Sequence, residues 1–243
     1  MPRVFVHGHP ETAAIWEPLL AELDGPPPVL LSPPGYGAPV PDGFAATVTD
    51  YRDWLITELE AIGEPADLVG HDWGGGHVVN TVMVRPDLVR SWVSDVLGAF
   101  DADYEWHEYA RREQRSDGPA VRFDPDFDTR VAILVQVGLG EPIARLIAEA
   151  QREPMAEVAH ALYHSAAQPV MSDLGRDLEL AAKRPGLSLL ATEDHYVGTV
   201  EQRRRAGDRS GARTVTLEGL GHWWMVEDPA RGARVLEEFW KGL

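Results

Sequence analysis

Short apolar runs alternate with helical periodicity in two parts of the chain, residues 1–99 and 186–243. The apolar runs, which we expect to be strands, are residues 4–6, 29–31, 66–70, 91–97, 187–191 and 213–217. Between them, apolar side chains recur every three or four residues over residues 12–23, 51–62, 74–83 and 229–240, as on one face of a helix. Strands that alternate with helices predict a parallel sheet with helices on both faces. The strands are almost wholly apolar, which suits burial on both faces.

The middle of the chain has a different pattern. Residues 100–185 contain helical spacing at 130–137, 142–151 and 155–163, and no convincing strand. An acidic stretch with Pro and Gly, residues 117–128, is expected to be a loop. We therefore predict a helical cap, residues 100–185, inserted into an α/β core formed by residues 1–99 and 186–243.

Composition excludes several classes of function. The chain has 243 residues, no cysteine and a net charge of −17. Thiolate nucleophiles and disulfides are therefore absent, and binding to nucleic acid or an anionic membrane is disfavoured. The one basic cluster, residues 203–205, lies in a helical pattern and is expected to be a solvated helix face. No membrane-length apolar run or secretory signal is apparent, so we expect a cytoplasmic protein that acts on a small molecule without a metal or other cofactor.

The candidate chemistry begins at Asp72. The apolar run 66–70 leads into Gly70-x-Asp72-x-Gly74, and a helical pattern follows. This is the spacing of a nucleophile elbow, a tight strand-to-helix turn that presents one side chain above a sheet. Ser is the usual central residue, whereas here it is Asp. The alternative is that Asp72 only caps the helix, which would leave the flanking glycines unexplained.

Four motifs together resemble a known superfamily. They are His7-Gly8-His9-Pro10, the elbow with Trp73 after the nucleophile, Glu193-Asp194 after the penultimate strand, and Gly219-Leu220-Gly221-His222 after the last. In this order they resemble the α/β-hydrolases, in the branch of epoxide hydrolases and haloalkane or haloacid dehalogenases. That branch usually has two further strands before the His-Gly strand. The resemblance therefore implies a sheet of about six strands, whose exposed edge is compatible with a homodimer.

The resemblance and the chemistry together assign roles. A carboxylate at residue 72 suits displacement at saturated carbon, giving an ester on the protein that water must then hydrolyse. His222 is the expected base for that hydrolysis, and an acid would orient it. The backbone N–H groups of His9 and Trp73 are expected to bind the oxyanion.

Two residues compete for the role of the acid. Asp194 occupies the usual position after the penultimate strand. Asp95 follows the fourth strand, where some relatives place their acid 24 residues after the nucleophile. Here the separation is 95 − 72 = 23, and a shift of one residue on a strand turns a side chain to the other face. We therefore favour Asp194 over Asp95, unless a bulge restores the register.

The leaving group is expected to be set by the cap. Tyr163 resembles a cap tyrosine that donates a proton to an opened epoxide, with Tyr104 or Tyr109 as its partner. Each tyrosine is equally consistent with a simple core position. Donors for a halide would instead be Trp73, Trp106 and His107.

We thus predict an epoxide hydrolase, with a dehalogenase as the alternative. The residues His9-Pro10-Glu11 favour an epoxide hydrolase over a dehalogenase. A protein of this fold that only binds a small molecule is a further alternative from another class.

Overall fold

The protein is built on one six-stranded sheet, as the sequence predicts. The computed structural model describes residues 1–119, 123 and 126–243. The strands are β1 (Arg3–Val6), β2 (Val29–Leu31), β3 (Ala66–Gly70), β4 (Val89–Ser94), β5 (Gly186–Ala191) and β6 (Arg213–Leu217). Their order is β2-β1-β3-β4-β5-β6, and every neighbouring pair is parallel. The carboxyl ends of all six strands therefore lie at one edge, where the loops that follow them meet.

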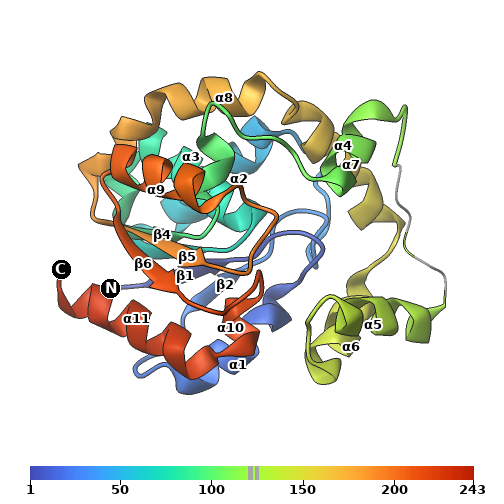
Figure 1. Ribbon diagram of the computed structural model, residues 1–243, viewed down its shortest axis with the longest axis horizontal. Coiled ribbons are helices and arrows are strands. Elements are labelled where there is room, and N and C mark those ends of the chain that lie inside the picture. Colours follow the sequence, from blue (N-terminus) through green and yellow to red (C-terminus); the bar gives the residue numbers. More distant parts are fainter. Residues whose placement is uncertain (120–122, 124–125) are drawn as a thin grey trace.

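Successive strand residues point to opposite faces of the sheet and belong to two separate hydrophobic cores. Val4 and Leu68 join the core on the face of α2 (Val48–Ile62), α3 (Trp73–Val84) and α9 (Val200–Arg209). Phe5 and Val69 join the core on the other face. There η1 (Ala13–Trp16), α1 (Glu17–Glu22), α10 (Trp224–Glu227) and α11 (Pro229–Lys241) cover the sheet (Figure 1). The central strands β3, β4 and β5 are buried on both faces, which explains why they are largely apolar, whereas the edge strands β2 and β6 are partly exposed.

Local signals fix several helix ends. At the start of α2, Thr47 and Asp50 form a reciprocal capping box. Gly63 ends this helix with φ of 80°, a left-handed conformation that favours glycine. Pro18 near the start of α1 divides the predicted helix 12–23 into a 3₁₀ turn and a short α-helix, because proline cannot donate the helical hydrogen bond.

Within the described residues, the segment between β4 and β5 contains helices joined by turns and irregular stretches, and no strand. It contains η3 (Leu97–Phe100), α4 (Glu108–Arg115), α5 (Phe127–Gln136), α6 (Glu141–Ala150), α7 (Glu153–Ser165), α8 (Val170–Leu174) and η4 (Gly175–Lys183). Helices α4 and α7 pack together and share a core with α2 and α3, whereas α6 packs against η1 and α5 packs on α6, in the other core (Figure 1). Part of the predicted loop 117–128 lies outside the described residues, and α5 already begins at Phe127.

Two sequence predictions are wrong. The strand expected at 91–97 ends at Ser94, because Ser94 Oγ accepts from the backbone N–H of Val96 and the chain turns into η3. Arg203 is not on a solvated face: it is 3% exposed and donates to the backbone oxygens of Ala191 and Asp194. A further 3₁₀ turn, η2 (Pro86–Leu88), precedes β4. Within the described residues, every helix is too short or too polar to cross a bilayer.

Candidate active site

Asp72 sits on a strained turn between β3 and α3. Its φ of 50° and ψ of −129° are unfavourable for a residue with a side chain, at a cost of about 1–3 kcal/mol. Gly74 is required here because a Cβ would lie 2.1 Å from the backbone oxygen of Val6. The backbone N–H of Asp72 donates to Asp95 Oδ1 at 3.1 Å, which holds the turn. This geometry is that of a nucleophile elbow.

A backbone donor already faces one oxygen of Asp72. The N–H of His9 donates to Asp72 Oδ1 at 2.8 Å. A Cβ on Gly8 would come within 2.2 Å of the same oxygen and 2.6 Å of the Trp73 amide nitrogen, so glycine allows this close approach. The backbone amides of His9 and Trp73 therefore lie close together beside Gly8 and Asp72.

His222 lies between two carboxylates. Its Nδ1 is 2.8 Å from Asp194 Oδ2, and its Nε2 is 3.6 Å from Asp72 Oδ2. The backbone N–H of Tyr196 donates to Asp194 Oδ1 at 2.8 Å. Arg203, on α9, donates to the backbone oxygen of Asp194 and supports the same loop. His222 is thus hydrogen-bonded to Asp194 on one side and lies 3.6 Å from the Asp72 carboxylate on the other, the arrangement expected of a nucleophile–histidine–acid triad.

Burial and charge act in opposite directions on these groups. Burial lowers the pKa of His222, but the Asp194 carboxylate outweighs it and the pKa is raised above its usual value. Burial raises the pKa of Asp194, but His222 outweighs it and brings the value to about 2. The pKa of Asp72 is raised, chiefly because burial disfavours its charged form. Near neutral pH, Asp194 is therefore an anion, and its charge favours the protonated form of His222.

Asp95 does not contact His222. The pairing of β3 with β4 shifts by one residue at Ala66/Asp67, after which Gly70 lies opposite Ser94. Asp95 is therefore level with His71, and the next residue, Val96, is level with Asp72. Asp95 Oδ2 lies 2.5 Å from Nδ1 of His71. A bulge is present, but it does not bring Asp95 to His222.

His71 is also paired with Glu11 beneath the site. Its Nε2 lies 3.0 Å from Glu11 Oε1, and both side chains are fully buried. Ligand atoms of Glu11, His71 and His222 lie within 4.8 Å of one another, a spacing that would suit a metal ion. However, Glu11 Oε1 already accepts from the indole of Trp223, and His222 Nδ1 is bonded to Asp194. We interpret these groups as a hydrogen-bonded network.

A cavity of about 300 Å³ opens above Asp72 and His222. Aromatic side chains lie along it, namely His9, His107, Tyr109, Phe123, Tyr163, Tyr196 and Trp223. It is also lined by Arg130, Ile133 and Leu134 of α5, by Val137 just after that helix, and by Gln151. This size and apolar character suit a small organic molecule.

The predicted cap residues have different surroundings, and only some of them line the larger cavity. Tyr163 and Tyr109 meet edge to face with ring centroids 5.3 Å apart, and both line the cavity. The hydroxyl of Tyr104 instead donates to the backbone oxygen of Tyr196 at 2.7 Å. Trp106 stacks on Trp73 beside a smaller cavity of about 30 Å³.

His107 caps α4, since its Nδ1 accepts from the backbone N–H of Ala110, and its ring reaches both cavities.

Sequence reasoning did not find four residues of this region. Tyr196 contacts the ring of His222, Phe123 lines the cavity, Glu11 pairs with His71, and Arg203 supports Asp194. Glu11 had a usable signal, because it follows the His-Gly-x-Pro motif directly. The others carry no local pattern, since only the packing of distant segments brings them to the site.

Comparisons with known proteins agree with this geometry. Residues 4–235 match the profile of the alpha/beta hydrolase family. An epoxide hydrolase of Caballeronia sordidicola is 29% identical over 101 residues, which cover 36% of this chain and 28% of that protein. The match thus spans less than a third of the relative's length.

Solved structures share the fold at low identity. The E-2-(acetamidomethylene)succinate hydrolase superposes with a TM-score of 0.72 at 19% identity, covering 99% of this chain and 91% of that one. A loop variant of the haloalkane dehalogenase DbeA from Bradyrhizobium elkanii gives 0.68 at 16%, covering 98% and 88%. A thioesterase domain from the curacin biosynthetic pathway gives 0.74 at 17%, covering 98% and 91%. With the sheet, the elbow and the family profile in agreement, this chain belongs to the alpha/beta hydrolase family, with epoxide hydrolases and dehalogenases among its relatives.

Proposed function

We propose that this hydrolase opens a small epoxide through an ester on Asp72. The observation that carries the proposal is the unequal setting of the two Asp72 oxygens. Oδ1 accepts the His9 amide, whereas Oδ2 faces Nε2 of His222 and the cavity. Oδ2 is therefore the attacking atom, and Oδ1 becomes the carbonyl oxygen that stays beside its backbone donors.

The first step forms the ester. Asp72 Oδ2 bonds to one epoxide carbon, the carbon–oxygen bond of the ring breaks, and the alkoxide takes a proton from Tyr163. The Tyr163 hydroxyl is suited to this role because burial, and then the charge of Asp72, raise its pKa well above its usual value and keep it protonated. Tyr109, next to it in the cavity, is the second hydroxyl that would hold the same oxygen.

The second step returns the free enzyme. His222 takes a proton from water, and the hydroxide adds to the carboxyl carbon of Asp72. The acyl–oxygen bond then breaks, the departing oxygen takes the proton of the new Asp72 carboxyl group, and the proton on His222 returns to the Tyr163 oxygen through solvent as the diol leaves. Ester formation removes the charge of Asp72, which is one of the groups that raise the pKa of His222. His222 therefore loses its proton more readily in the intermediate, where it must act as a base.

Carbon–halogen hydrolysis is the second candidate, and one observation favours it. The indole Nε1 of Trp106 is buried and has no hydrogen-bond partner among the described residues. Trp106 lies with Asp72 and Trp73 around the smaller cavity, so it could donate to a departing halide.

The test combines an arrested ester with an isotope. His222→Gln is incubated with styrene oxide, other epoxides and short organohalides, and intact mass is measured. We expect an epoxide adduct on Asp72 that persists, while the wild type turns the same compound over. In H₂¹⁸O under single turnover, the label should enter Asp72 rather than the diol. If no compound gives an adduct and the wild type is inactive, the protein is a binding member of the fold and the proposal fails.

A further inference from the structure

A buried charged cluster lies under the site and takes no part in the steps above. It consists of Glu11 after β1, His71 at the end of β3 and Asp95 at the end of β4. Their side chains are 0%, 0% and 3% exposed. Nε2 of His71 is 3.0 Å from Glu11, and Nδ1 is 2.5 Å from Asp95. A neutral imidazole has one donor and one acceptor, so only the doubly protonated ring can donate to both carboxylates.

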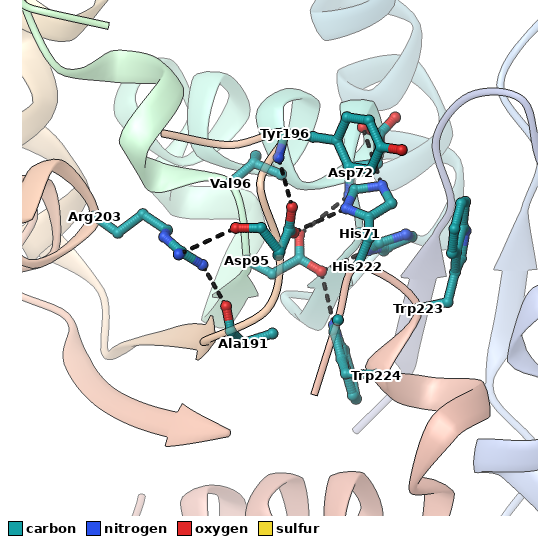
Figure 2. Close-up of polar contacts among 12 residues, drawn as sticks. His71, Asp72, Asp95, Val96, Ala191, Tyr196, Arg203, His222, Trp223 and Trp224 are labelled. Carbon is teal, nitrogen blue, oxygen red and sulfur yellow. Dashed lines mark hydrogen bonds and ion pairs between the residues drawn. The ribbon is translucent and has the colours of Figure 1, made fainter. Parts of the chain in front are cut away.

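The same carboxylates hold each loop that carries a reacting group. Asp95 Oδ1 accepts from the backbone N–H of Asp72 at 3.1 Å (Figure 2). Glu11 Oε2 accepts from the N–H of Gly8 at 3.4 Å, next to the oxyanion donor. The two residues after His222 donate their indole N–H groups as well, from Trp223 to Glu11 at 2.6 Å and from Trp224 to Asp95 at 2.8 Å.

The cluster also places charge beside the base. Two carboxylates and one imidazolium sum to −1, and the rings of His71 and His222 are 4.6 Å apart. At such separations in a buried site, a unit charge alters proton binding measurably. The other groups that face His222 are Asp194, Asp72, His107 and Tyr196, while Arg203 lies behind Asp194.

We propose that His71 is a permanently protonated positioning residue whose imidazolium joins Glu11 and Asp95, so that this cluster aligns the loops of Asp72, His9 and His222 and supplies the local charge felt by His222. The effect on turnover rests on the proposed function, but the protonation of His71 does not. Buried ionic groups add little stability over apolar packing. Their value here is orientation, because four hydrogen bonds join the cluster to the reacting loops and two more hold the cluster together.

The first test needs no substrate. ¹⁵N NMR of the histidine rings in the wild-type protein should show that the His71 ring stays protonated on both nitrogens from about pH 6 to about pH 9. Its ring protons should lie at low field, because charge-assisted hydrogen bonds are short and strong. This state agrees with the direction of the His71 pKa, which its two carboxylate partners raise well above the usual value against burial. If the His71 ring is neutral at pH 8, the proposal is overturned.

The second test uses the sign of a charge change. Glu11→Gln and Asp95→Asn each remove one negative charge, so protonated His222 becomes less stable. In each variant, the acid limb of the pH–rate profile for ester hydrolysis should move to lower pH by about one unit. The kcat should be about 3- to 30-fold lower, and KM should stay within about threefold of the wild-type value. Trp224→Phe is the matched control, because it removes a hydrogen bond to Asp95 without changing charge. Its limb should stay within about 0.2 pH units of the wild type.

The outcomes are separable. If both charge variants keep the wild-type limb, or if Trp224→Phe moves as far as they do, the cluster is only structural and the proposal is wrong. If the wild type turns over neither styrene oxide nor organohalides, the proposed function fails instead. In that case the titration of His222, followed by NMR in the same variants, still shows whether the charge acts on it.

Discussion

The floor and the wall of the cavity are built in different ways. The floor consists of the strand-end loops that carry Asp72, Asp95, Asp194 and His222, where each of these side chains is hydrogen-bonded or ion-paired. The wall consists of helices α4, α5 and α7, whose contacts with the cavity are mainly aromatic and apolar. The floor fixes a reaction that tolerates little displacement. Apart from Tyr163 and Tyr109, the wall is expected only to select what enters, and the following variants test this division.

The largest effect is expected at the nucleophile. Asp72→Asn should reduce kcat by about 10⁴-fold or more, because an amide oxygen does not form the ester intermediate. Steady-state hydrolysis of styrene oxide measures this. Asp87→Asn changes an exposed carboxylate paired with Arg85 and controls for the loss of charge. Activity of Asp72→Asn close to that of the control would remove the covalent mechanism.

The two candidate acids should differ strongly. Asp194→Asn should lower kcat by about 10³- to 10⁴-fold, since His222 loses the partner that orients it and stabilises its cation. Asp95→Asn should lower kcat much less, because Asp95 reaches only His71, Trp224 and the Asp72 backbone. Ester accumulation by intact mass separates them, with long-lived adduct expected only in Asp194→Asn. Equal effects would contradict both assignments.

This contrast shows what the chain can and cannot predict. Fold and floor follow from local patterns, because each motif ends a strand and all strand ends meet at one edge. The choice between Asp95 and Asp194 depends on a register shift at Ala66/Asp67, which alternation alone does not reveal. Arg203 was mistaken for a surface residue because its burial comes from packing against residues far away in the sequence. Tyr196 and Phe123 reach the cavity for the same reason.

A smaller effect is expected for the tyrosines that the wall places beside the reacting atoms. Tyr163→Phe should reduce kcat for epoxides by about 10²-fold, because the alkoxide loses its proton donor. Tyr109→Phe should cost less, about tenfold. Tyr104→Phe should change kcat by less than about threefold, since its hydroxyl is bonded to the Tyr196 backbone. Epoxide turnover by Tyr163→Phe at the wild-type rate would place proton donation elsewhere.

The pH dependence of ester hydrolysis tests whether His222 is the base. His222 must be neutral to act as the base, and its pKa is raised. The rate of ester hydrolysis should therefore reach its full value only above that pKa and should fall as the pH drops through it. His9 stays neutral throughout, since burial lowers its pKa to about 3. The acid limb of kcat therefore reports His222 and not His9. Single-turnover decay of the ester between about pH 5 and about pH 9 measures it, and a rate that rises as pH falls would exclude His222 as the base.

The smallest effect on epoxides should come from Trp106, and it separates the two candidate reactions. Trp106→Phe keeps the ring stacked on Trp73 and removes only an indole N–H that has no partner among the described residues. Epoxide turnover should change by less than about threefold. A halide departing from carbon would need this donor, so turnover of an organohalide should fall by about tenfold or more if that is the true substrate class. His107→Gln is the companion variant, because His107 reaches the same cavity with a donor of different geometry. A large loss in both variants on organohalides, with epoxides never turned over, would replace epoxide opening by dehalogenation while leaving the floor unchanged.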